Sequence, residues 1–335
     1  MSASSATDSA SSYGRRLLVQ LGPLLALAFV VTIFTVADSF QEHGGRFLSG
    51  PNFKNILIQS AVVAMAALGM TMIIIGGGID LSAGTALALC GTVMAWCFLH
   101  DWWPPAAIAA TILTGCATGA LNGALIGRLR VVPFIITLGT MTIYLGVAKY
   151  IAKNTTVRPA LNQVPQWMDY LLISVQPKWL FFPFGVWLVI FLAFFVAAIL
   201  RFTVFGRHII AMGSNDLAAR LCGIRVDRTR VLLYSFAGLF VGLAGMLQFS
   251  RLSEGSPTSG TGKELAIIAA VVIGGGSLSG GRGSILGTLT GAVMTEVISN
   301  GCTTLGLRNE LEEILLGAII IAAVTIDQLR HRRFA

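Results

Sequence analysis

The sequence contains few charged residues. Only 11% of its 335 residues are Asp, Glu, Lys or Arg, whereas 55% are hydrophobic. A soluble domain carries roughly 25% charged residues, because its surface must face water. So few charges do not cover a water-exposed globule, and the surface must therefore meet lipid. The apolar residues run on for about 20 positions, the length of a membrane-crossing helix, without the alternation of a transmembrane β-barrel. The sequence therefore predicts an all-α polytopic membrane protein.

Cofactor and catalytic patterns are also missing. The five cysteines lie scattered, mostly inside apolar runs, so neither a disulfide framework nor a metal site is predicted. There is no Gly-x-x-x-x-Gly-Lys-Ser/Thr loop, and we therefore expect this chain not to bind ATP on its own. Acidic residues do not accumulate along the apolar runs, which weighs against a proton-coupled carrier, and the four histidines are too scattered for a membrane-embedded enzyme. We expect a protein that is not an enzyme and that binds no cofactor.

Ten apolar runs are candidate membrane spans. They lie near residues 17–37, 56–76, 82–99, 106–127, 132–152, 180–200, 229–249, 265–279, 284–303 and 311–327. The weakest is 265–279, because its strongly apolar part, Leu265 to Ile273, is too short to cross unaided. We interpret it as a short span that is shielded from lipid and runs into the glycine stretch Gly274–Gly276. The prediction is about ten transmembrane helices, with short or broken helices at glycine-rich turns.

The basic residues predict the orientation of these spans. Arg15 and Arg16 precede the first run, and arginines recur at 128–130, 201–228, 282 and 330–333, which alternation places on the same side. Cytoplasmic segments carry such an excess of Lys and Arg, so both termini are expected to be cytoplasmic. The net charge of +8 is thereby assigned to membrane topology and not to nucleic acid.

The same alternation divides the chain. We expect a disordered cytoplasmic tail at 1–16, a transmembrane domain at 17–327 and a basic cytoplasmic tail at 328–335. Residues 77–81 are expected to form a turn on the inside. The segment between the runs that end at 249 and begin at 265, which includes Lys263 and Glu264, is expected outside.

Two longer segments face water. Residues 153–178 lie outside and carry Trp167 and Tyr170; they form either an ordinary connecting loop with an interfacial half-helix or a docking surface for an extracytoplasmic partner. Residues 207–228 lie inside, where Ser214 or Asn215 can cap a short helix. That helix either lies on its own protein or on lipid headgroups, or docks against a partner. The residues expected to shape it are Gly213, Asn215, Ala218, Ala219 and Gly223.

Polar residues within the apolar runs are candidates for a solute pathway, because such groups are costly inside a bilayer. Glu296 has Asn300 one turn later on the same face. A second stripe of hydroxyl groups follows helical spacing, and two polar residues follow the glycine break Gly76–Gly78. The alternative for each residue is interhelical hydrogen bonding. The candidates are Asp80, Ser82, Asn122, Thr137, Thr140, Tyr144, Glu296 and Asn300.

Five stretches together resemble the permease subunits of bacterial ABC importers of the ribose/xylose/galactoside type. The resemblance covers about residues 56–327. The stretches are Gly69-Met70-Thr71, Gly77-Gly78-Ile79-Asp80-Leu81-Ser82-Ala83-Gly84, Pro133 to Met141, Gly213 to Ile224, and Glu264 to Gly275. Two positions depart from the family pattern: Leu145 stands where Arg is frequent, and Ala266 where Asp is frequent.

The resemblance implies an ABC importer permease fold in the bacterial cytoplasmic (inner) membrane. It implies a homodimer or pseudo-dimer of permeases, two cytoplasmic ATPase subunits that carry ATP and Mg²⁺, and a periplasmic sugar-binding protein. Residues Gly213 to Ile224 resemble the helix that couples the permease to the ATPase, and the implied solute is a monosaccharide or related polyol. Transport of another small polar solute, such as a branched-chain amino acid, and a secondary carrier without an ATPase remain alternatives.

Overall fold

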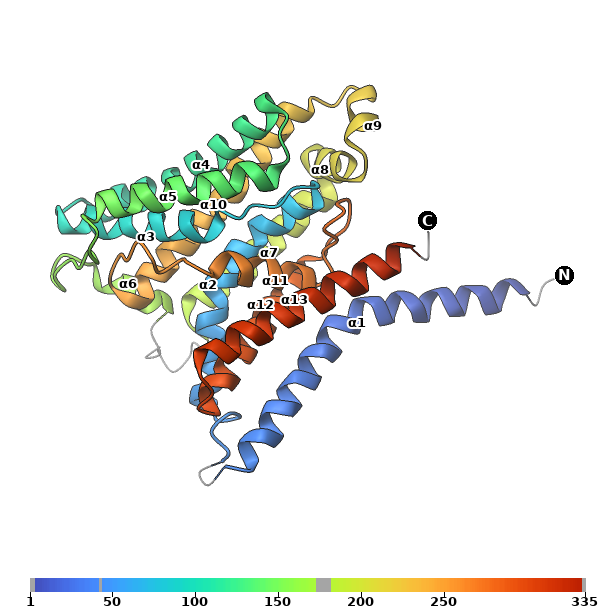
Figure 1. The fold of residues 1–335 in the computed structure, drawn as a ribbon, viewed down its shortest axis with the longest axis horizontal. Coiled ribbons are helices and arrows are strands. Elements are labelled where there is room, and N and C mark those ends of the chain that lie inside the picture. The colour runs from blue at the N-terminus through green and yellow to red at the C-terminus, as the bar shows by residue number, and fades with distance from the viewer. Residues whose placement is uncertain (1–3, 42–43, 173–181, 333–335) are drawn as a thin grey trace.

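The computed structural model describes residues 4–41, 44–172 and 182–332, and within these ranges the chain is helical apart from its connections (Figure 1). The helices are α1 (Ser4–Ser39), α2 (Gly50–Ile75), α3 (Ala83–Leu99), α4 (Pro104–Leu129), α5 (Pro133–Ile151), α6 (Gln166–Leu172), α7 (Phe184–Phe202), α8 (Val204–Ser214), α9 (Asp216–Leu221), α10 (Val226–Leu252), α11 (Lys263–Ile273), α12 (Ile285–Thr304) and α13 (Asn309–Arg332). We call the end of the bundle that carries α8 and α9 the α9 end, and the end that carries α6 the α6 end.

Each of the ten apolar runs falls on a helix, so the all-helical class is confirmed. The number of about ten crossings is not confirmed. By length and composition, six helices in the described ranges can cross a membrane, namely α1, α2, α4, α5, α7 and α10. Helix α3 is a shorter apolar helix, and α11 has only 11 residues. At 1.5 Å per residue α11 is about 16 Å long, roughly half the hydrocarbon thickness of a bilayer.

The expected boundaries near both chain ends do not coincide with structural boundaries. Helix α1 already begins at Ser4, within the stretch expected as a disordered tail at 1–16, and α13 continues to Arg332, past the expected boundary at 327. Alanine and serine early in α1 are compatible with helix, so composition alone did not mark its start. The division of the chain into tails and a membrane domain otherwise stays a prediction.

Helix α10 lies at the centre of the bundle, where it contacts α2, α3 and α4. It meets α4 backbone to backbone, because Gly115, Gly119 and Gly123 recur on one face of α4. A Cβ atom added at Gly119 would overlap the carbonyl oxygen of Tyr234. Small residues let membrane helices approach this closely and gain van der Waals contact. The pair α4–α10 is therefore a closely packed scaffold around which the other helices pack.

The chain leaves the helical conformation inside the bundle after α2. Gly77 has φ +77°, a left-handed value that glycine adopts without strain. The chain then runs past α4 and α5 to begin α3 at Ala83. Gly77 is exposed, but Asp80 is only 6% exposed, so the segment expected as an inside turn at 77–81 does not stay at a surface: from Gly78 on it enters the bundle. Buried partners replace the hydrogen bonds that lipid does not offer to a non-helical backbone.

A second break follows α10. Gly255 packs against Thr92, and Gly260 packs against Gly84, so the connection runs antiparallel to α3 toward its N-terminus. From the spacing of Thr92 and Gly84, it penetrates about 12 Å along α3. Residues Lys263 and Glu264 therefore begin α11 inside the bundle, and their expected place in an outside segment is wrong. Most of α11 is buried, as expected for a short span shielded from lipid.

Replacing Gly119 by Ala should lower the unfolding temperature, because the new methyl group forces α4 away from α10. Overpacking of this kind costs about 1–3 kcal/mol. Gly139→Ala is the matched control, since Gly139 is also helical and has nothing within 4 Å of an added Cβ. The measurement is thermal unfolding of both variants in detergent. Equal unfolding temperatures would show that the α4–α10 contact is looser than described.

Candidate functional site

A buried polar cluster joins the first break to α4 and α5. Asp80 Oδ1 accepts hydrogen bonds from the backbone nitrogen of Ser82 at 2.8 Å and from its hydroxyl at 2.6 Å. Asn122 Nδ2 donates to Ser82 Oγ at 2.8 Å. The Tyr144 hydroxyl lies 2.9 Å from Asn122 Oδ1 and 2.8 Å from the carbonyl oxygen of Thr118. Asp80, Asn122 and Tyr144 are at most 6% exposed, so this cluster is closed to solvent in the described chain.

Two threonines of α5 extend the cluster. Thr137 Oγ1 accepts from the backbone nitrogen of Leu81 at 3.1 Å and lies 3.3 Å from the carbonyl oxygen of Ile79, which fixes the extended segment against α5. Thr140 Oγ1 donates to the Thr137 carbonyl oxygen at 3.3 Å and is buried. The Thr137 contacts are hydrogen bonds between segments, which the sequence left open as the alternative to a pathway, whereas the Thr140 bond lies within α5. Six of the eight candidate pathway residues therefore lie together, and most of their polar atoms are already paired.

The other two candidates are not partners. Asn300 exchanges two amide hydrogen bonds with Asn52, at 2.8 and 2.9 Å, and so ties the end of α12 to the start of α2. Glu296 is half-buried and interacts electrostatically with Lys263 and Arg251. Their spacing of one helical turn placed them on one face but did not reveal that each has a different neighbour.

A polar surface that the sequence analysis missed precedes α11. Thr258, Thr261 and Gly262 are exposed, and Lys263 is half-buried beside Glu296. Glu264 is 9% exposed; one carboxylate oxygen accepts from the Gly262 nitrogen, and Oε2 has no hydrogen-bond partner. The signal was present in the sequence. An apolar run too short to cross a bilayer follows a Gly/Ser/Thr/Pro-rich stretch, so the rest of the membrane thickness had to be covered by that stretch. We call residues 256–263 the polar segment.

At the α9 end, the expected short helix is present as α9. Asn215 caps it, since its Oδ1 accepts from the Ala218 nitrogen at 2.9 Å. Gly223 follows the last turn with φ +83°, as expected. Of the two alanines expected to shape it, Ala219 is 4% exposed and faces its own protein. Outward-facing residues are Leu217, Ala218 and Leu221, of which Leu221 is 90% exposed.

Ion pairs fix α9 to the start of α10. Arg220 forms a two-pronged hydrogen-bonded pair with Asp227, at 2.7 and 3.2 Å, and also reaches Asp216 at 3.3 Å. Arg230 of α10 reaches Asp216 at 3.2 Å. The hydrogen bond to Asp227 raises the pKa of the Arg220 guanidinium above its ordinary value, which keeps it charged. Helix α9 is therefore held in one orientation relative to α10.

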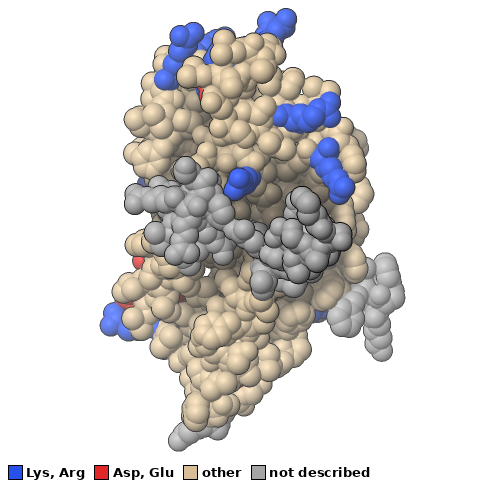
Figure 2. All heavy atoms as spheres, turned by 90° about the vertical axis from the view of Figure 1, so that its right-hand side faces the viewer, with Lys and Arg blue, Asp and Glu red and all other residues tan. Residues whose placement is uncertain are grey.

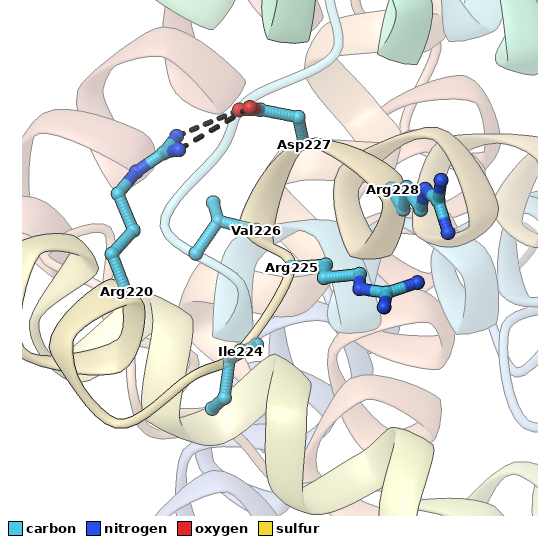
Figure 3. A pocket seen from close by; sticks show the side chains of 6 residues that line it. All are labelled: Arg220, Ile224, Arg225, Val226, Asp227 and Arg228. Carbon is cyan, nitrogen blue, oxygen red and sulfur yellow. Dashed lines mark hydrogen bonds and ion pairs between the residues drawn. The ribbon is translucent and has the colours of Figure 1, made fainter.

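Beside α9 lies a pocket of about 400 Å³ (Figure 3). It is lined by Arg220, Ile224, Arg225, Val226, Asp227 and Arg228. Figure 3 shows that Arg220 and Asp227 point toward each other, whereas Arg225 and Arg228 point away from that pair. Both of the latter are exposed and have no acidic partner among the described residues. The pocket therefore presents two unneutralised positive charges next to an apolar helix face.

The chain matches the family described as "Branched-chain amino acid transport system / permease component" over residues 52–324. It is 36% identical over 316 residues to the ribose import permease protein of Escherichia coli K12, covering 94% of this chain and 95% of that protein. It is 33% identical to the fructose import permease protein of Rhizobium meliloti, covering 97% of this chain and 93% of that protein. It is also 33% identical to the xylose transport system permease protein of E. coli K12, covering 86% of this chain and 88% of that protein. No solved structure matches. This chain therefore belongs to the family of ABC importer permeases that includes these sugar permeases.

Proposed function

We propose that this chain is the membrane-spanning subunit of an ATP-driven importer and forms the translocation pathway for a monosaccharide or related polyol. The observation that carries the proposal is similarity along nearly the whole chain to permeases named for ribose, fructose and xylose. These names favour a sugar over the branched-chain amino acid of the family description. ATP and Mg²⁺ would be bound by separate ATPase subunits. The exposed α9 supports that division of labour, because a secondary carrier has no need of a docking helix.

We place the α9 end, and with it both termini, on the cytoplasmic side of the inner membrane. The charge distribution supports this orientation. On the face that Figure 2 presents, most Lys and Arg side chains lie in the upper half, at the height of α8 and α9 in Figure 1. At the α6 end, acidic residues such as Asp101 and Glu254 accompany the basic ones. Cytoplasmic loops are enriched in Lys and Arg.

The ATPase would dock on α9 and on the pocket beside it. Leu217, Ala218 and Leu221 offer an apolar face, and Arg225 and Arg228 offer two charges for acidic side chains of the ATPase. The periplasmic sugar-binding protein would dock at the α6 end, where Trp167 and Tyr170 of α6 are half exposed. Residues 173–178 of the expected outside docking segment lie outside the described residues.

The solute pathway would follow the polar segment and not the Asp80 cluster. Non-helical backbone at membrane depth is tolerated only in protein or beside a water-filled cavity, and Thr258 and Thr261 are exposed in the single chain. Glu296 and Lys263 would add a carboxylate and an ammonium group to the same wall. A second permease copy would supply the opposite wall. Hydroxyl, amide and charged groups are the partners that a neutral polyhydroxylated solute requires.

Deleting this chain should abolish import of one sugar. Cells that lack this chain but keep the binding protein and the ATPase are offered radiolabelled ribose, fructose and xylose. Uptake of the one sugar that the system carries should fall to the background rate. A plasmid copy should restore uptake. Unchanged uptake of all three sugars would rule out the proposed substrate class, and transport by the purified chain in liposomes without ATP would favour a secondary carrier.

Removing both free charges from the pocket should weaken the ATPase complex. We expect Arg225→Gln with Arg228→Gln to raise the dissociation constant about tenfold at low salt and less at high salt, because exposed charges are screened. Lysine at both positions should restore most of the binding. Arg46→Gln, at the opposite end, is the control. Binding of the purified ATPase to nanodiscs checks this, and an unchanged dissociation constant would exclude the pocket from the interface.

Thiol labelling should separate the polar segment from the Asp80 cluster. In a background where the exposed Cys222 is replaced by Ser, Thr261→Cys should react with a water-soluble thiosulfonate, whereas Thr140→Cys should stay unmodified because Thr140 is 2% exposed. Labelling of the native buried cysteines sets the background. Fast labelling at residue 140 with protection at 261 would reverse the assignment of the pathway.

A further inference from the structure

Three glycine-containing segments that are far apart in the sequence meet at the α9 end. They are the start of the first break after α2, the end of α8, and the connection between α11 and α12. The backbone nitrogen of Gly281 donates to the Ile75 carbonyl oxygen at 2.8 Å, which ties the third segment to the end of α2. A Cβ added at Gly213 would overlap that same Ile75 oxygen. All three backbones therefore converge on the last turn of α2.

The contacts among these segments are between backbones. A Cβ at Gly77 would lie 3.4 Å from the Cα of Gly213, and a Cβ at Gly280 would lie 3.0 Å from the Cα of Gly77. A Cβ at Gly281 would lie 2.5 Å from Ser214 Oγ. A side chain at Gly213 or Gly280 would push the segments apart, because its Cβ would overlap backbone atoms of a neighbouring segment. We call Gly77, Gly213, Gly280 and Gly281 the glycine junction.

Each member of the glycine junction leads directly to an element with a part in transport. Gly213 lies three residues before α9, which is proposed to receive the ATPase. Gly77 opens the extended segment that enters the bundle and becomes α3. Gly280 and Gly281 lie in the connection between α11, which continues the polar segment, and α12, which carries Glu296. The junction is thus the place where the docking helix meets both broken spans.

The physical character of these contacts suits transmission of a displacement. A close-packed interior deforms little and passes strain on, and backbone groups have no rotamers through which to absorb it. The left-handed φ values of Gly77, Gly280 and Gly281, between +74° and +87°, let the chain turn where it crosses the junction. At Gly213 and Gly280 a side chain would need space that the neighbouring backbone occupies.

We propose that the glycine junction is the mechanical link through which a movement of α9 reaches both broken spans, so that its glycines are positioning residues for the coupling of ATP hydrolysis to transport. The junction moves as one unit, and the two breaks respond together. This inference rests on the proposed function of the chain as an ABC permease.

The test compares import with ATP hydrolysis in proteoliposomes that contain the full complex with its binding protein. In Gly213→Ala the added methyl group should separate the junction and lower the number of sugars imported per ATP hydrolysed by about tenfold, because an overlap of this kind shifts a conformational equilibrium by that order. The rate of ATP hydrolysis should stay within about twofold, since α9 itself is unchanged. Gly146→Ala, in a helix with open space around the added Cβ, should leave the ratio as in the wild type.

Two results would overturn the link. If import and hydrolysis in Gly213→Ala fall in proportion, with the amount of folded complex, the junction is only structural; if both rates stay as in the wild type, the junction plays no part in coupling. A wild-type complex that hydrolyses ATP without importing sugar would instead contradict the proposed function, so the two failures are distinguishable.

A cross-link tests the same claim by comparing one variant in its oxidised and reduced forms. The Cβ position of residue 281 lies 3.4 Å from the Cβ of Ser214, near the 3.5–4.5 Å that a disulfide spans. The variant Ser214→Cys with Gly281→Cys should have the same sugar-to-ATP ratio when oxidised as when reduced, because the joined segments already move together. Loss of import on oxidation, restored by a reducing agent, would show that the segments slide past each other and would contradict a junction that moves as one unit.

Discussion

Two stretches of this chain leave the helical conformation inside the bundle, and a bilayer has no water to satisfy the backbone groups that they expose. Protein must therefore surround both stretches. The first is held by Thr137 and by the Asp80–Ser82–Asn122–Tyr144 hydrogen bonds, and the second lies against α3 through Gly84 and Thr92. The placement of α4, α5 and α10 follows from this constraint, because these helices form the walls around the breaks.

Glycine allows helices and connections of this chain to pack in close backbone contact. Between α4 and α10 it brings two long helices into backbone contact and builds a rigid scaffold. At the glycine junction it brings three connections into backbone contact beneath α9. The same residue thus serves two purposes in this chain, since it stiffens the part that holds the breaks and joins the breaks to the segment proposed to meet the ATPase.

Local features of the sequence predicted much of the fold. Apolar runs located ten of the described helices, and residue type narrowed the cap of α9 to Ser214 or Asn215 and marked Gly223 as the left-handed residue after it. The partners of polar residues were not predictable, because helical spacing gives a face but not its neighbour: Asn300 pairs with Asn52, whereas Glu296 interacts electrostatically with Lys263 and Arg251. Lys263 and Glu264 were misplaced because alternation of spans assumes that each connection stays at a membrane surface, and the polar segment does not.

The account depends on α9 facing the compartment that holds ATP, and the native Cys222 at the end of α9 reports on this directly. Cys222 is exposed, whereas Cys90, Cys97 and Cys302 are buried. The measurement is modification of Cys222 by a membrane-impermeant maleimide, followed by peptide mass spectrometry. The account predicts modification in inverted membrane vesicles, slowed by bound ATPase, and none in intact cells with a permeable outer membrane. Modification of Cys222 in those intact cells would place α9 outside, beyond the reach of the ATPase, and would contradict it.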